Sequence, residues 1–136
     1  MIKEAYCSKE VSILLKEKGF NEATNRHYNA QYDEIRTVSD TFMTYWNNEE
    51  HMKVLMMEGA LAIPTHQMAM AWLREVHNIF IVIEPHMYDY INEKNSSYVI
   101  SLWQGDNYSE NITSKDYPTY EEAVEAALKY SLENLI

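Results

Sequence analysis

Between residues 65 and 83 the spacing of hydrophobic residues changes from that of a helix to that of a strand, and this change constrains the fold most. Apolar residues recur every three or four positions after Thr65, a residue type that caps helix N-termini. They are Met68, Ala69, Trp72, Leu73 and Val76. The run IFIVI then has the β-branched and aromatic composition of a buried strand. Asn78 between the two suits the left-handed turn that ends a helix, so the segment predicts a helix followed directly by a strand.

Two further segments have residues that mark helix ends. The first has such residues at both ends, and the second has them at its start. Ser8 precedes an apolar stripe, and Gly19 after that stripe supplies a left-handed stop. Near the C-terminus, Thr119 and Glu122 have the spacing of a capping box before an amphipathic run that reaches Leu135. Both segments are therefore predicted helices.

Aromatic-rich segments predict the remaining strands. HYNAQY at 27–32 and TFMTYW at 41–46 lie on either side of a polar stretch at 33–40, and each is a predicted strand. SYVISLWQ at 97–104 is predicted to return as the hairpin partner of the strand that begins at Ile79. Hairpin connections of this kind favour an antiparallel sheet.

Together the elements follow the order α-β-β-α-β-β-α. We expect an α+β fold with two layers, in which helices pack on one face of an antiparallel sheet of about four strands. The 136 residues suit one hydrophobic core, so we expect a single domain over 1–136. The pattern at 49–63 fits either a helix or a strand, and Pro85 indicates a bulge or an edge.

Composition excludes several classes of partner and site. The formal charge of -10 argues against non-specific binding to phosphate backbones, so no nucleic acid is expected as a partner. No apolar run approaches the ~18 residues of a membrane span, so we expect a cytoplasmic protein with no membrane partner. Cys7 is the only cysteine, which rules out an internal disulfide and a thiolate metal cluster.

Common catalytic and cofactor motifs are absent from the sequence. It contains no GxGxxG, GxxxxGK[ST], GxSxG, HExxH or DxDxDG pattern. We therefore expect no cofactor, name no catalytic residue, and lean away from an enzyme.

His66 and His77 flank Trp72 on the predicted middle helix and suggest a metal site at first sight. At about 1.5 Å per residue, they lie roughly 16 Å apart along the helix, whereas two imidazoles that share a metal must each approach it to about 2 Å. We expect no metal here, and we interpret both histidines and Trp72 as residues that pack against a sheet.

A better candidate ligand-binding site follows that helix. Strand alternation would place His86, Tyr88 and Tyr90 on one face, in line with Glu84. A row of polar aromatic side chains could line a groove, and a carboxylate beside His86 could tune it as a base. The alternative is that the four residues form only the wetter face of a sheet.

The segments PTHQMAMAWLREVHNIFIVI and YPTYEEAVEAALKYSLENLI carry a wider pattern. Their arrangement resembles a family of short uncharacterised proteins from gut anaerobic bacteria and their phages. The matching residues are Pro64, Thr65 and Gln67, then 72–75 (WLRE), then 120–123 (YEEA).

The resemblance covers about half of the chain, mostly residues 62–83 and 117–136. Ile63 stands where the family has Ala, and His66 stands where an apolar residue is usual. The family has no established activity. The resemblance therefore implies only a phage-linked origin and a single α+β domain, and it identifies no catalytic residue.

Three functions remain open. The first is a non-enzymatic interaction or accessory protein of phage or mobile-element origin, which binds a protein partner or itself as a homodimer. Eleven tyrosines and three tryptophans favour it, because aromatic residues are enriched at interface cores. The second is a small-molecule-binding or weakly catalytic domain that uses the His86, Tyr88 and Tyr90 face. The third is an acidic DNA-mimic inhibitor.

Overall fold

The computed structural model describes residues 2–87, 96–110, 112–113 and 115–136. The chain divides into two compact units, Met1–Ala69 and Met70–Ile136, which we call the N-terminal unit and the C-terminal unit. Helices and small antiparallel sheets make up the fold, so the predicted α+β class is confirmed. That residues 1–136 form one domain stays a prediction.

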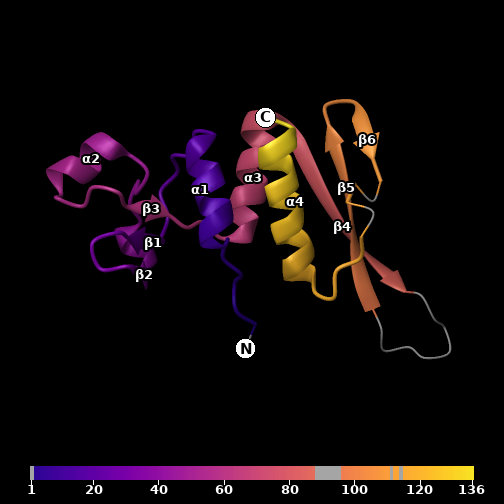
Figure 1. Ribbon diagram of the computed structural model, residues 1–136, viewed down its shortest axis with the longest axis horizontal. Coiled ribbons are helices and arrows are strands. Elements are labelled where there is room, and N and C mark those ends of the chain that lie inside the picture. Colours follow the sequence, from indigo (N-terminus) through magenta and orange to yellow (C-terminus); the bar gives the residue numbers. More distant parts are fainter. Residues whose placement is uncertain (1, 88–95, 111, 114) are drawn as a thin grey trace. The chain divides into compact units, whose positions relative to one another are not determined.

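The N-terminal unit contains a three-stranded antiparallel sheet in the order β2-β1-β3. Its elements (Figure 1) are α1 (Lys9–Glu17), β1 (Arg26–Asn29), β2 (Glu34–Thr37), the 3-10 helix η1 (Asp40–Phe42), α2 (Glu49–Val54) and β3 (Leu61–Ala62). The predicted start of α1 is confirmed, because the Ser8 hydroxyl accepts a hydrogen bond from the Val11 N–H at 3.1 Å. Gly19 then adopts φ 96°, the left-handed stop.

The second strand predicted in this unit was wrong. The segment at 41–46 overlaps η1 and forms only an isolated bridge between Thr24 and Thr44. The strand that pairs with β1 is instead β2, within the polar stretch at 33–40, and all four of its residues are exposed. Since β2 buries no face, it shows no apolar alternation for a sequence pattern to detect.

Residues 49–63, whose pattern fitted a helix or a strand, contain one of each. The Asn48 side chain caps α2 by accepting a hydrogen bond from the His51 N–H at 3.1 Å. The two residues of β3 are buried and pair with the middle of β1, where His27 lies opposite Ala62.

The C-terminal unit contains a second antiparallel sheet, in the order β4-β5-β6. Its elements are β4 (Ile79–Met87), β5 (Ser96–Gln104), β6 (Asn107–Ser109) and α4 (Tyr120–Asn134). The helix α3 (His66–His77) contains the boundary between the units. The fold thus has two three-stranded sheets where we expected one sheet of about four strands, and β6 lies in a segment with no predicted element.

The helix and strand at the centre of the sequence are confirmed. The Thr65 hydroxyl caps α3 by accepting a hydrogen bond from the Met68 N–H at 3.1 Å. Asn78 has φ 56° at the end of that helix, and β4 begins with the next residue. β5 is the predicted hairpin partner of β4. β4 is not a fully buried strand, because Phe80 is exposed and residues 81–83 are only partly buried.

The helix α4 covers one face of the β4-β5-β6 sheet, and Figure 1 shows it running beside β4 and β5. Ile100 on β5 packs with Ala123 and Ala127 of α4, and Ile81 and Ile83 of β4 join this cluster. Side chains on a strand alternate between faces, so the even-numbered residues of β4 point away from α4. We call the face of this sheet opposite α4 the outer face.

Pro85 lies in the edge strand β4. The sequence indicated either a bulge or an edge at this position. The Tyr98 N–H and C=O both bond to Tyr117, so they point away from β4. Pro85 is the Cα partner of Tyr98, and the two therefore form a non-hydrogen-bonded pair. The nitrogen of Pro85, which has no N–H, consequently faces the outer edge of β4, where it cannot donate to another strand.

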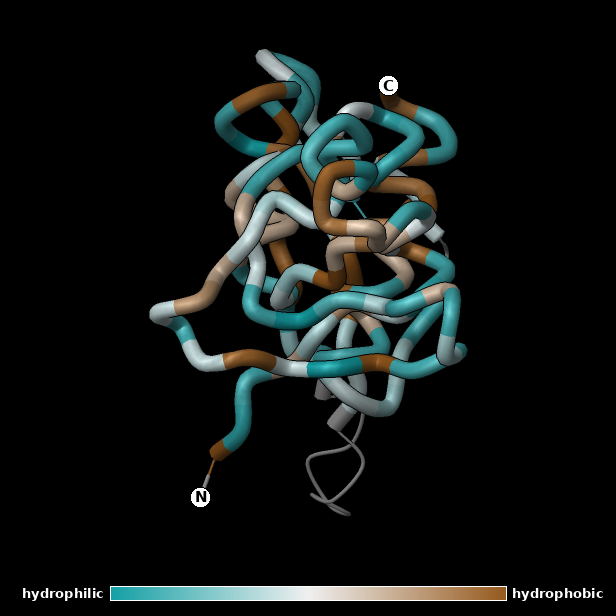
Figure 2. Tube along the Cα trace, turned by 90° about the vertical axis from the view of Figure 1, so that its left-hand side faces the viewer, coloured by the Kyte–Doolittle hydropathy of each residue, from teal (hydrophilic) through white to brown (hydrophobic). Residues whose placement is uncertain are grey.

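Hydrophobic residues occur in short stretches along the chain, interrupted by hydrophilic ones, as Figure 2 shows. Among the residues that the structure describes, no helix combines the length and the apolar character needed to cross a membrane.

Candidate functional site

The predicted site residues Glu84 and His86 lie on the outer face of the C-terminal sheet. They share this face because they are two positions apart on β4. Tyr88 and Tyr90, the other two residues of the predicted site, lie outside the described residues. The predicted row of four side chains is therefore observed only in its first half.

The structure brings two residues to His86 that the sequence did not indicate. The imidazole Nδ1 lies 3.2 Å from Asp116 Oδ2, and the Ser97 hydroxyl donates to the same carboxylate oxygen at 2.9 Å. Ser97 is the cross-strand partner of His86 and also donates to its carbonyl at 3.2 Å. We call His86, Ser97 and Asp116 the His86 cluster.

The His86 cluster has the residue types of a hydrolytic triad but a different order of hydrogen bonds. In a triad the serine hydroxyl bonds to the imidazole, which takes up its proton during attack. Here both Ser97 and His86 bond to Asp116. The carboxylate therefore orients the ring, as a residue that prepares His86 to bind a polar group would do.

Aromatic side chains cross the same face at the opposite end of β4. Phe80 on β4 is the Cα partner of Trp103 on β5, and Trp103 is the partner of Tyr108 on β6. Partners directly opposite each other in antiparallel strands share a face. The Trp103 and Tyr108 rings touch, with centroids 4.7 Å apart. We call these three residues the aromatic row.

Each ring of the aromatic row is partly exposed. Phe80, Trp103 and Tyr108 are 40%, 43% and 42% exposed, although Phe80 and Trp103 lie in the two longest strands of the protein. Large aromatic side chains normally bury most of their surface, and a contiguous exposed patch of them marks an interaction site.

Carboxylates flank the aromatic row and the His86 cluster. Glu84 is exposed on the outer face between them, and Asp116 belongs to the cluster itself. Beside the row, the Tyr108 hydroxyl donates to Glu110 at 3.4 Å. The outer face therefore combines an apolar patch at one end with carboxylates beside it and along the rest of the face.

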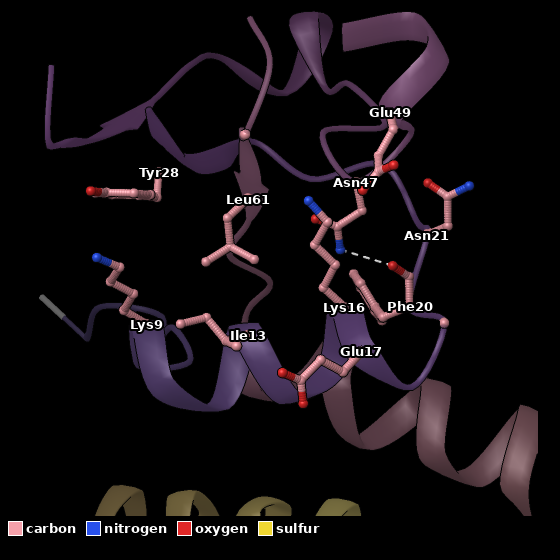
Figure 3. A pocket seen from close by; sticks show the side chains of 12 residues that line it. Lys9, Ile13, Lys16, Glu17, Phe20, Asn21, Tyr28, Asn47, Glu49 and Leu61 are labelled. Carbon is pink, nitrogen blue, oxygen red and sulfur yellow. Dashed lines mark hydrogen bonds between the residues drawn. The ribbon is translucent and has the colours of Figure 1, made fainter. Parts of the chain in front are cut away.

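A pocket of about 760 Å³ lies in the N-terminal unit, in a part of the chain where sequence analysis predicted no site (Figure 3). α1 contributes one wall, and Tyr28 of β1 and Leu61 of β3 contribute to the rest. Sequence patterns do not reveal it, because its residues come from elements that meet only in the folded chain.

His66 and His77 occupy the first and last positions of α3. The His77 ring meets Trp72 edge-on, with centroids 4.7 Å apart, and His66 is buried. Among the described residues, no three His, Cys, Asp or Glu side chains are arranged to hold a metal ion.

Comparisons of this chain with protein-family models, with curated proteins and with solved structures found no match. Membership of the gut-anaerobe and phage family stays a prediction.

Proposed function

We propose that this chain is a small non-enzymatic protein-interaction protein, and that its outer face binds a partner protein whose own surface is apolar with a basic rim. The observation that carries the proposal is the exposed aromatic row of Phe80, Trp103 and Tyr108.

Three adjacent strands present the aromatic row, which gives it the properties of an interface core. A sheet holds its side chains at fixed spacing, so these rings lose little freedom when a partner covers them. Tryptophan and tyrosine also supply much of the binding energy at measured interfaces. The flanking polar groups of the outer face would then form the rim.

Charge favours a partner of a different kind over a second copy of the chain. The formal charge is -10, Glu84 and Glu110 lie near the aromatic row, and Asp116 lies with His86 at the other end of β4. Two identical outer faces would bring these carboxylates together, which costs free energy, whereas a basic rim would pair with them. Association should accordingly weaken as salt concentration rises.

The proposal includes an accessory role in the cytoplasm of a cell that carries the phage or mobile element. It follows from the resemblance of 62–83 and 117–136 to phage-linked proteins and from the absence of a membrane-length apolar run in the sequence. No nucleic acid takes part, because the acidic charge repels phosphate backbones.

Binding of a small molecule at the His86 cluster is a second candidate function. It is favoured by one observation, that Asp116 holds the imidazole in a fixed orientation. A metabolite screen would test it: ligand-induced thermal shifts should disappear in His86→Ala, and shifts that persist unchanged in this variant would eliminate the candidate.

The interaction proposal is tested with variants of the aromatic row. A partner captured by the wild-type chain would be purified, and its affinity measured for wild type, Phe80→Ser, Trp103→Ser and the control Phe42→Ser. Phe42 is 70% exposed and lies in the N-terminal unit. We expect each outer-face variant to weaken binding by about 2 kcal/mol, roughly thirtyfold, and the control to bind like wild type.

Two results would contradict the proposal. One is a partner that binds Trp103→Ser as tightly as wild type. The other is a chain that forms a dimer by light scattering, with the dimer lost in Trp103→Ser, because a second copy would then occupy the face.

A further inference from the structure

The pocket of the N-terminal unit has the size of a small-molecule site, since such sites typically enclose about 300–1,000 Å³. Lys9, Ile13, Lys16 and Glu17 line one side of it. Residues three or four apart on a helix share a face, so the four side chains come from one face of α1. One helix face thus supplies both charged and apolar groups to the pocket.

An apolar surface occupies the middle of the pocket. Ile13 and Leu61 lie there in Figure 3, between Lys9 and Tyr28 at one end and Asn21 and Glu49 at the other. Leu61 is 5% exposed, whereas Ile13 is 41% exposed. A half-exposed isoleucine facing a pocket gains free energy when an apolar group covers it.

The first end of the pocket carries a positive charge held in place. The Lys9 ammonium lies 3.9 Å from the centroid of the Tyr28 ring, a cation–π contact. The Tyr28 hydroxyl donates to Asp33 at 2.6 Å, which fixes the ring. Among the described residues, no carboxylate forms a salt bridge with Lys9, so its charge is available to an anion.

The other end carries the exposed carboxylate of Glu49, and the exposed Glu17 lines the α1 side of the pocket (Figure 3). The Lys16 ammonium is also there and donates to the Ala60 carbonyl at 3.3 Å. Glu17, Glu49 and Lys16 together give this part of the lining a net negative charge. Its polar groups suit a cation or a strong hydrogen-bond donor.

The base of this end is rigid because the Asn47 side chain ties two segments together. Its Nδ2 donates to the Phe20 carbonyl at 2.8 Å, and its Oδ1 accepts from the Ala62 N–H at 2.9 Å. Phe20 and Ala62 are both buried. The pocket is therefore largely formed before any ligand binds, which lowers the entropy cost of binding.

We infer that this pocket binds a short zwitterionic molecule with an apolar body. Its carboxylate would lie at Lys9, its apolar part over Ile13 and Leu61, and its ammonium at Glu49. Lys9 and Glu17 are about 12 Å apart along α1 at roughly 1.5 Å per residue. An extended tripeptide spans about 10 Å, so the ends of an apolar tripeptide match the two charged ends.

The test is a titration of the 136-residue chain with the tripeptide Leu-Ala-Leu, followed by ¹⁵N NMR. Three further ligands separate its features: the N-acetylated peptide, the C-amidated peptide, and 8-aminooctanoate, a zwitterion that is not a peptide. We expect Leu-Ala-Leu to shift the amide signals of α1 and β3, and each blocked peptide to bind about threefold to fivefold more weakly. If 8-aminooctanoate binds and Leu-Ala-Leu does not, the ligand is a zwitterion but not a peptide.

Variants give the sharper control. Lys9→Met should weaken the free peptide about threefold to fivefold and leave the amidated peptide unchanged, because the amide has no carboxylate to lose. Ile13→Glu should weaken every ligand at least about tenfold by placing a charge in the apolar middle. Both residues are exposed, so the fold should persist. Lys129→Met, a matched loss of charge on α4, should bind like wild type.

The inference is overturned if no ligand shifts the signals of α1 and β3 in the millimolar range. It is also overturned if the amidated peptide binds as tightly as the free peptide, or if Lys9→Met and Lys129→Met weaken binding equally. None of these results bears on the aromatic row, so they leave the proposed interaction function untouched.

Discussion

His27 in the N-terminal unit is buried against Trp46, and its ring stacks on the indole with centroids 3.7 Å apart. Burial lowers the pKa of His27 below its ordinary value, and the neighbouring Arg36 guanidinium lowers it further. As pH falls below about 6.5, the unfolded chain takes up a proton at this residue while the folded chain does not. The free energy of unfolding should therefore decrease as pH falls through this range, until the pH reaches the lowered pKa.

The variant His27→Phe isolates this effect, because it keeps an aromatic ring against Trp46 and removes the titrating group. Urea denaturation of both proteins between about pH 8 and pH 5 gives the difference in their unfolding free energies. We expect wild type to lose stability relative to the variant as pH falls. A difference that stays constant with pH would show that His27 does not titrate differently in the two states.

At the same scale, the candidate site was only partly predictable. Alternation along one strand was enough to place Glu84 and His86 on one face, because that information is local. Asp116 lies 30 positions from His86 in the sequence, and only the fold brings the two together. The strands that contain Phe80 and Trp103 are predictable from the sequence, but the exposure of these two side chains is not. Composition does not say which face of a sheet stays uncovered.

Among the elements, α4 offers a direct test of helix capping. The Thr119 hydroxyl accepts a hydrogen bond from the Glu122 N–H at 3.1 Å, in an exposed position. Thr119→Ala should lower the free energy of unfolding by about 1 kcal/mol, and Thr119→Ser should keep most of it. Chemical denaturation measures both. Equal losses in the two variants would mean that the hydroxyl does not act as a cap.

The edge strand β4 gives a second prediction at this scale. Pro85 removes one N–H from its outer edge, beside the apolar residues 79–83. Pro85→Val restores that donor and should increase self-association at high concentration, measured by light scattering. Pro85→Val that stays as monodisperse as wild type would show that the proline does not protect the edge.

The helices and strands were predictable to different extents for a physical reason. α1, α3 and α4 carry capping residues and apolar stripes, which act within about one turn of the chain. The exposed strands β2 and β6 bury no face and pair through backbone atoms that any residue possesses. TFMTYW was wrongly predicted as a strand because aromatic residues are common in strands. Its first two residues instead belong to η1.

On the scale of the whole molecule, the charge of -10 and the aromatic row act together. Like charge keeps copies of the chain apart in solution and discourages the aromatic row from associating with itself. The same charge would speed encounter with a basic partner. An exposed apolar surface can therefore persist on this protein without causing aggregation.

Photo-crosslinking in the cell would show directly whether the outer face binds a partner protein. The residue at position 103 would be replaced by p-benzoylphenylalanine, and the same residue would be placed at position 42 as the control. We expect one protein adduct from position 103, formed with a partner whose surface is basic, and none from position 42. Adducts of equal yield from both positions, or an adduct only with a second copy of the chain, would contradict this expectation.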